Sequence, residues 1–294
     1  MAEQKGTTGR RPAKDGPWYL VKQTYNEWSA DNAMTLGAAL AYYAAFSLAP
    51  LLVIIVAVAG LFMGREAMQA AIVSQVQENM GPAAATYIQS MVTAAYPQGG
   101  EGLAAIMGIV VLVIGATSVF VMLTQALNII WKVDPDRETG LGKMILTRLL
   151  GLVMMLIIGL ILLLSVIFTT GVQALLTTLT AATSIPPAVF LVATGIVSFL
   201  IITLVFAAIF KVLPDTTIAW SDIWIGAMIT AVLFTGGKYV LGLYLGRGSA
   251  VSAFGVAGSL VVILLWIYYS AQIFLLGAEL TQVYARTYGS RAQT

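Results

Sequence analysis

The sequence predicts an all-α fold, a polytopic membrane bundle of six transmembrane helices with both termini in the cytoplasm. Only 10% of the 294 residues are charged, whereas soluble domains carry about 25%. The charges leave three long uncharged stretches, at 32–64, 102–131 and 149–210. A helix needs about 20 apolar residues to cross the hydrocarbon core, so each stretch can span a membrane at least once.

Six spans follow from these stretches and from two apolar segments nearer the C-terminus. The 149–210 stretch must hold two helices, because the consecutive prolines of TSIPP (183–187) end one helix and suit the start of the next. The predicted spans are 34–63, 103–131, 149–175, 187–210, 223–246 and 255–280. The first is too long for the apolar region of a signal peptide, so we expect it to be retained.

Lysine and arginine residues orient the chain. Twelve of the 15 lie before the first span, in the loops after the second and fourth spans, or after the sixth. Arg65 and Arg247 lie on the other side, and Lys238 lies within the fifth span. The positive-inside rule therefore places both termini in the cytoplasm, and an even number of spans also requires the termini to share a side.

The predicted organisation is a cytoplasmic tail (1–33), a transmembrane domain (34–280) and a second cytoplasmic tail (281–294). The one sizeable external segment, 65–102, carries apolar residues at helical spacing on both sides of a Gly-Pro break at 81–82. We expect a helical hairpin that packs against the outer ends of the bundle. The alternative is a lid or a surface that docks a partner.

Lys238 interrupts the fifth span, about 12 Å inside its outer end. A lysine stem can extend to the headgroups, so snorkelling is one interpretation. Charges inside a membrane are costly and usually functional, which favours an ammonium group that faces a polar cavity and attracts an anionic group. Glu279 lies toward the cytoplasmic end of the next helix, so no direct salt bridge between the two is expected.

The sixth span carries a polar stripe whose members are three, four or seven residues apart: Tyr268, Gln272, Glu279, Gln282 and Arg286. Gln282 and Arg286 are expected in a solvated last turn. Gln272 and Glu279 favour an inward-facing role, because an amide or acid that faced lipid would lack partners. We expect Glu279 at the inner boundary, where it orients the helix and gates a path.

The first span combines a proline with two tyrosines. Pro50 removes a backbone hydrogen bond and is expected to kink the helix. Tyr42 and Tyr43 are adjacent and point about 100° apart, so at most one faces straight into any cavity. We assign these three residues to the substrate pathway, together with four others: Lys238, Tyr268, Gln272 and Glu279.

Small residues mark places where helices can approach closely. Gly242 and Gly246 are one turn apart on the fifth span, and small residues recur every fourth position from Gly37 in the first. Both patterns are typical of close packing between transmembrane helices.

The chain contains no histidine and no cysteine. Histidine is the commonest metal ligand and the usual acid or base at neutral pH, so its absence argues against many enzyme mechanisms. Only one acidic cluster, DPDRE (134–138), lies on the cytoplasmic side, which argues against a metal-dependent nuclease. We predict no catalytic residue, no metal, no cofactor and no nucleic-acid partner.

Four segments resemble the YihY/BrkB family of bacterial inner-membrane proteins: ALAYYAAFSLAPLL in the first span, KVLPD (211–215), KYVLGLYLG (238–246) and SAFGVAGSLVVILLWIYYSAQIFLLGAEL (252–280). Pro214, Asp215, Trp266 and Gly277 lie in these motifs. The resemblance implies a fold and an inner-membrane location. Some family members are named ribonuclease BN, others carry a virulence or serum-resistance label, and some are linked to export of envelope lipids.

The function hypothesis is a transporter or permease that handles envelope lipids or another anionic amphipathic substrate, with membrane lipids as partners. The alternative is a non-catalytic scaffold that docks an envelope protein through the 65–102 hairpin and the 132–148 loop. A channel-like role is a third reading. The sequence leaves open the substrate, the energy source, the direction of transport and whether the chain forms a homo-oligomer.

Overall fold

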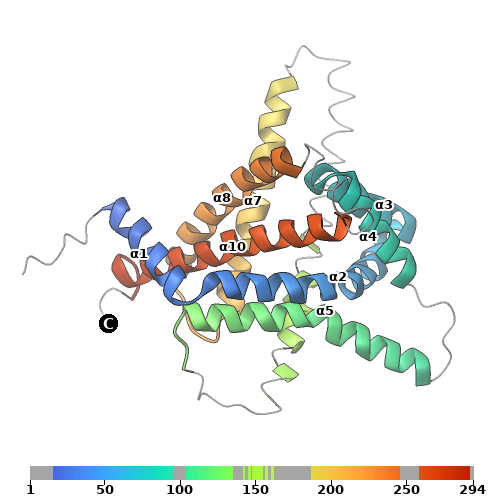
Figure 1. Ribbon diagram of the computed structural model, residues 1–294, viewed down its shortest axis with the longest axis horizontal. Coiled ribbons are helices and arrows are strands. Elements are labelled where there is room, and N and C mark those ends of the chain that lie inside the picture. The colour runs from blue at the N-terminus through green and yellow to red at the C-terminus, as the bar shows by residue number, and fades with distance from the viewer. Residues whose placement is uncertain are drawn as a thin grey trace, which may run out of the picture.

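A computed structural model describes residues 16–95, 103–134, 187–245 and 258–291, together with residues 142, 145, 146, 148–154, 156, 157, 160 and 161. Throughout this part the secondary structure is helical, without strands (Figure 1). The helices are α1 (Pro17–Ala30), α2 (Ala33–Met63), α3 (Arg65–Met80), α4 (Pro82–Ala95), α5 (Leu103–Ile130), α7 (Pro187–Val212), α8 (Trp220–Leu245) and α10 (Gly258–Thr287).

In the described part, five helices are long and apolar enough to cross a membrane: α2, α5, α7, α8 and α10. They correspond to five of the predicted spans, and α10 continues seven residues beyond the predicted end at 280. The third predicted span, 149–175, is described only as far as 161, and the rest lies outside the described residues. The polytopic helical fold is therefore confirmed, whereas the number six and the cytoplasmic side of the termini stay predictions.

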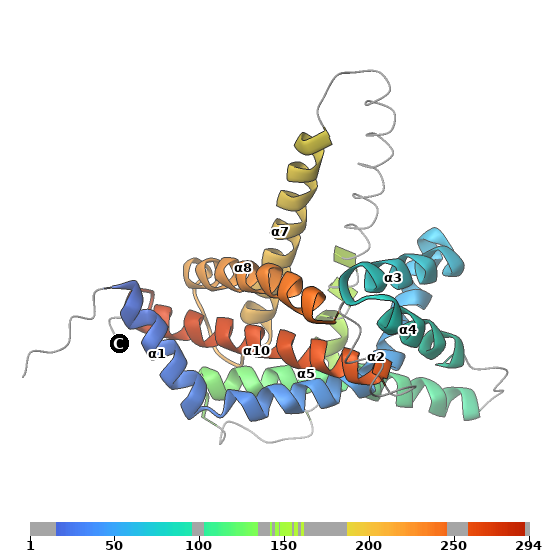
Figure 2. The same ribbon diagram turned by 45° about the horizontal axis from the view of Figure 1, so that its top comes forward.

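Helix α10 is the centre of the bundle. It packs against α1, α2, α4, α5 and α8, and its buried residues run from Gly258 to Ala285. Figures 1 and 2 show α2 and α5 beside it, with α8 on another side. Helix α7 crosses the others steeply, and its N-terminal half extends beyond the bundle in both views, with exposed Val192, Ile196 and Leu200. Nothing in the described residues explains that projection.

Two Gly-Thr pairs lock α8 to α10. A Cβ atom on Gly277 would lie 1.9 Å from Oγ1 of Thr230, and one on Gly226 would lie 1.7 Å from Oγ1 of Thr281. Each threonine of one helix thus occupies the space that a glycine leaves on the other. Each hydroxyl also donates a 2.7 Å hydrogen bond to the glycine carbonyl four residues earlier in its own helix. The arrangement satisfies both hydroxyls and brings the two backbones close together.

Helix α2 is held against α5 by a similar close approach. A Cβ atom on Gly115 would lie only 2.9 Å from the ring of Pro50, so the glycine makes room for the proline. One turn earlier, the hydroxyls of Ser47 and Ser118 are 2.8 Å apart and share a hydrogen bond. The proline of the first span therefore has a packing role at the α2–α5 interface.

Helices α3 and α4 form the helical hairpin expected for 65–102, described as far as 95, with Gly81 between them in a left-handed conformation (φ 89°). Its buried apolar side chains pack with residues of α2 and α10 in one cluster: Leu52, Val56, Met68, Ala84, Ile88, Val92, Val262 and Ile263. The hairpin packs against the bundle, whereas its position on the external side and a lid or docking role stay predictions.

Helix α1 was not expected, since it lies in the segment assigned to the N-terminal tail (1–33). It lies across the C-terminal end of α10 (Figure 1). The backbone N–H of Gly16 donates a 3.1 Å hydrogen bond to the hydroxyl of Tyr288, so the two ends of the described chain lie side by side. This polar stretch packs on a surface that the C-terminal part of α10 supplies.

The Gly-Thr pairs give a prediction for stability. Gly277→Ala forces a Cβ atom against Thr230, and overpacking of this kind costs about 1–3 kcal/mol. We expect a lower thermal-unfolding midpoint in detergent. Gly236→Ala on α8 is the matched control, because its Cβ would meet nothing within 4 Å. Equal midpoints for the two variants would contradict the packing described.

Candidate functional site

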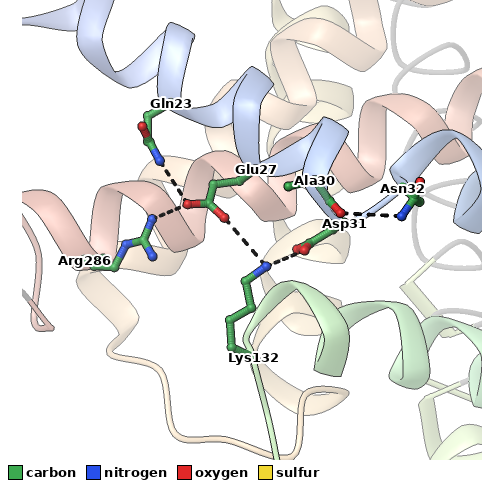
Figure 3. A network of polar contacts seen from close by, with 7 residues as sticks. All are labelled: Gln23, Glu27, Ala30, Asp31, Asn32, Lys132 and Arg286. Carbon is green, nitrogen blue, oxygen red and sulfur yellow. Dashed lines mark hydrogen bonds and ion pairs between the residues drawn. The ribbon is translucent and has the colours of Figure 1, made fainter.

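A network of charged residues joins α1, α5 and α10 at one end of the bundle (Figure 3). Oε1 of Glu27 accepts hydrogen bonds from Arg286 at 2.6 Å and from Gln23 at 2.9 Å. The ammonium of Lys132 lies 3.6 Å from Oε2 of Glu27 and donates a hydrogen bond to Oδ1 of Asp31. Three segments far apart in sequence are thereby held together.

Two residues with a left-handed backbone conformation position the side chains of this network. Asn32 (φ 52°) forms the turn between α1 and α2, directly after Asp31, and asparagine tolerates this conformation better than most residues. Lys132 (φ 53°) ends α5, and the N–H of Val133 bonds back to the carbonyl of Asn128. A lysine in this conformation is uncommon, and here it directs the ammonium toward α1.

The network shifts the pKa of Glu27 and Lys132. The hydrogen bond from Arg286 lowers the pKa of Glu27 below its ordinary value, although partial burial works in the opposite direction. Partial burial works to lower the pKa of Lys132, but Asp31, Glu279 and Glu27 together outweigh it, and the pKa is raised. Both groups are therefore held in their charged forms.

Glu279 lies behind this network and is fully buried. Neither of its carboxyl oxygens accepts a hydrogen bond from a described residue, and Oδ2 of Asp31 is also buried without a partner. The carboxyl group of Glu279 interacts electrostatically with that of Asp31 across the contact between α1 and α10. Two ionised carboxylates are both acceptors, so no hydrogen bond joins them unless one carries a proton.

Lys238 lies in the C-terminal half of α8 and is half-buried. Its ammonium lies 5.7 Å from the ring centroid of Tyr239, and within the described residues it has no carboxylate partner. It borders a recess too narrow to take up a water molecule, lined also by Phe234, Leu241, Trp266, Tyr269 and Ser270.

The other predicted pathway residues do not line the recess beside Lys238. Nε2 of Gln272 lies 3.4 Å from the carbonyl oxygens of Ala33 and Met34 at the start of α2. Tyr42 and Tyr43 are exposed on α2 and contact each other edge to face. Pro50 packs at the α2–α5 interface, and Tyr268 is half-buried on α10. Their roles in a pathway stay predictions.

The residues assigned to structural motifs have definite places. Asp215 follows the buried Pro214 and forms two hydrogen bonds of 2.8 Å with the side chain of Asn128, which ties the end of α7 to α5. The ring of Trp266 contacts Phe234 edge to face. Gly277 receives Thr230, as described above. Gly242 lies in the last turn of α8, and Gly246 lies outside the described residues.

The sequence analysis did not predict a functional role for Asp31, Glu27 or Lys132. The positions of Asp31 and Lys132 in the sequence were nevertheless informative. Asp31 directly precedes the uncharged stretch 32–64, and Lys132 directly follows 102–131. The topology places both of these flanking charges at the same end of the bundle as the end of α10. Charges that border spans on one side are therefore candidate partners for an acid at that boundary.

Long apolar helices that pack through glycine and hydroxyl side chains, with charges gathered beyond their ends, define a multi-pass helical membrane protein. A family described as Virulence factor BrkB matches residues 24–294. The match covers nearly the whole chain, so the protein belongs to the BrkB family.

Several curated relatives are named UPF0761 membrane proteins. The chain is 28% identical to one from Ralstonia nicotianae, covering 85% of this chain and 55% of the relative. It is 27% identical to one from Albidiferax ferrireducens, covering 89% and 61%. A third, from Pseudomonas paraeruginosa, is 28% identical over 85% and 59%. The chain thus spans less than two thirds of these relatives. No solved structure matches it.

The network predicts a pH-dependent stability. The pKa of Glu27 is lowered on folding, so its contribution is complete above the ordinary value of 4.5 and is lost as the pH falls through the lower folded value. At neutral pH, Glu27→Gln should cost no more than about 1 kcal/mol, because Arg286 is partly exposed.

The measurement is the thermal-unfolding midpoint of wild type and Glu27→Gln between pH 7 and pH 3. The difference between them should shrink as the pH falls below about 4.5. Glu78→Gln, an exposed glutamate on α3, is the control and should show no such trend. A difference that stays constant with pH would refute the assigned role of Glu27.

Proposed function

We propose that the protein is a non-enzymatic permease of the bacterial inner membrane that moves an anionic amphipathic substrate, such as an envelope lipid. The observation that carries this proposal is the recess between α8 and α10 beside Lys238. Each polar side chain that lines it can donate a hydrogen bond: Lys238, Trp266, Tyr269 and Ser270. Such a set suits a phosphate or carboxylate headgroup.

Two of these donors are available to a ligand. Lys238 has no carboxylate partner within the described residues, and Nε1 of Trp266 is buried there without an acceptor. A charged or polar group left unpaired in an apolar environment costs free energy, and an anionic headgroup would remove that cost. The surrounding Phe234 and Leu241 suit the adjoining apolar part of an amphipathic molecule.

Gly237 brings a third donor to the same place. A Cβ atom on Gly237 would lie 2.5 Å from the hydroxyl of Tyr269, so the absent side chain lets that hydroxyl lie against α8, next to Lys238. The recess is too narrow for a headgroup as it stands. Uptake therefore requires α8 and α10 to separate at this end, while the Gly-Thr pairs hold them at the other.

The test uses reconstituted protein and fluorescent phosphatidylglycerol, with zwitterionic phosphatidylcholine as the comparison of zero net charge. Movement of labelled phosphatidylglycerol between leaflets should fall about tenfold in Lys238→Met, the equivalent of losing roughly 1.4 kcal/mol from one charged contact. Lys238→Arg should keep most of the activity. Lys22→Met, an exposed lysine on α1, is the control and should behave as wild type.

The scaffold alternative gives the opposite pattern. If the protein acts by docking an envelope partner, replacing the α3–α4 hairpin abolishes its cellular function while Lys238→Met does not. Full movement of phosphatidylglycerol by correctly inserted Lys238→Met would also end the proposal.

A further inference from the structure

The acid at the end of α10 has an environment that the permease proposal does not use. Glu279 is completely buried, with 0% of its surface accessible, and both of its carboxyl oxygens lack a hydrogen-bond partner within the described residues. An unpaired buried carboxylate costs several kcal/mol. Something must therefore satisfy this group in the working protein.

The charges around it do not balance. The described groups in electrostatic range of Glu279 are Asp31, Glu27 and Lys132, and Arg286 pairs with Glu27. When all are ionised, three carboxylates face two cations. Glu27 is bound by Arg286, and Oδ1 of Asp31 by Lys132, so the excess negative charge falls on the buried Glu279 and on the unpartnered Oδ2 of Asp31.

We propose that Asp31 and Glu279 form a carboxyl pair that binds and releases one proton. One proton makes the network neutral. It also converts two opposed acceptors into an O–H donor and a carboxylate acceptor, joined by a charge-assisted hydrogen bond. On release the proton leaves for solvent and both groups are again carboxylates, so charge and atoms balance without any other reactant.

A metal cation fits this place less well than a proton. The ammonium of Lys132 already bonds to Asp31 and would repel a second cation. A sodium- or calcium-sized ion needs about six or more oxygen ligands, and within the described residues no group of three or more metal-binding side chains occurs. A proton needs only the two carboxyl groups.

The path for the proton runs through the α1–α2 turn. The side chain of Asp31 is 10% exposed, whereas Glu279 is fully buried. Asp31 is therefore the group that exchanges with water, and Glu279 is the inner member of the pair. Because the pair lies between α1 and α10, proton release places the excess charge at their interface and weakens the attachment of α1.

The pair binds a proton whether or not the protein moves an anionic substrate, so either proposal can fail alone. If both hold, this is the place where proton movement could drive transport. A spectroscopic test separates the two, because it needs no substrate.

The experiment is infrared difference spectroscopy of the purified full chain in lipid nanodiscs, between acidic and alkaline pH. We expect a protonated-carboxyl band that is lost on raising the pH and is absent in both Glu279→Gln and Asp31→Asn. Glu66→Gln, an exposed acid on α3, should keep the band. A band that survives in Glu279→Gln overturns the proposal.

Lys132→Met supplies a test that does not remove either acid. Loss of this cation should raise the pH at which the band disappears by about one unit, tenfold in proton affinity. Should the acid variants fail to fold, this shift decides the matter, since an unchanged midpoint overturns the proposal. Disappearance of the band on adding sodium chloride at fixed pH, and not on adding potassium chloride, would replace the proton by a sodium ion.

Discussion

The burial of Glu279 is the constraint on which this end of the molecule depends. A carboxyl group at the end of a membrane helix could reach water within a turn or two, but α1 lies across α10 and closes that route. The same helix supplies Glu27 and is followed directly by Asp31, and these two acids bring Lys132 and Arg286 into the network. The attachment of α1 is therefore inseparable from the electrostatics of the acid that it covers.

In the rest of the bundle, apolar helices associate although lipid is as apolar as their side chains, so burial of apolar surface alone does not hold them together. Glycine and small hydroxyl residues allow close packing at two interfaces, α8 with α10 and α2 with α5. The Gly-Thr pairs lie at the Glu279 end of α10, whereas Lys238 and its recess lie at the other end. In the proposed permease, this separation would let one end stay fixed while the other opens.

Much of the fold could be predicted because apolar length is a direct signal. The bounds of α2 and α5 differ by one residue from the predicted spans. Helix α1 could not be predicted in this way, since it is polar and short and packs mainly against α10, which is far away in the sequence. The hairpin α3–α4 was predictable from helical spacing and a Gly-Pro break, features that lie within the local sequence.

The site was harder to predict because its members are far apart in the chain. Glu279 could be selected as an acid in an apolar helix, but Asp31 lies in a turn almost at the other end of the sequence, and only the fold brings them together. Likewise Gly277 could be selected from its motif, whereas its partner Thr230 looks like any hydroxyl residue in a span. A single sequence does not show which residues of different helices pack against each other.

The central claim is that the carboxylate of Glu279 has no hydrogen-bond or ion-pair partner within the described residues, and the stability of Glu279→Gln at alkaline pH tests it most directly. Glutamine has nearly the same shape without the charge, so the thermal-unfolding midpoint should equal or exceed that of wild type. A midpoint several degrees below wild type would mean that the carboxylate has a strong partner, and would contradict the account.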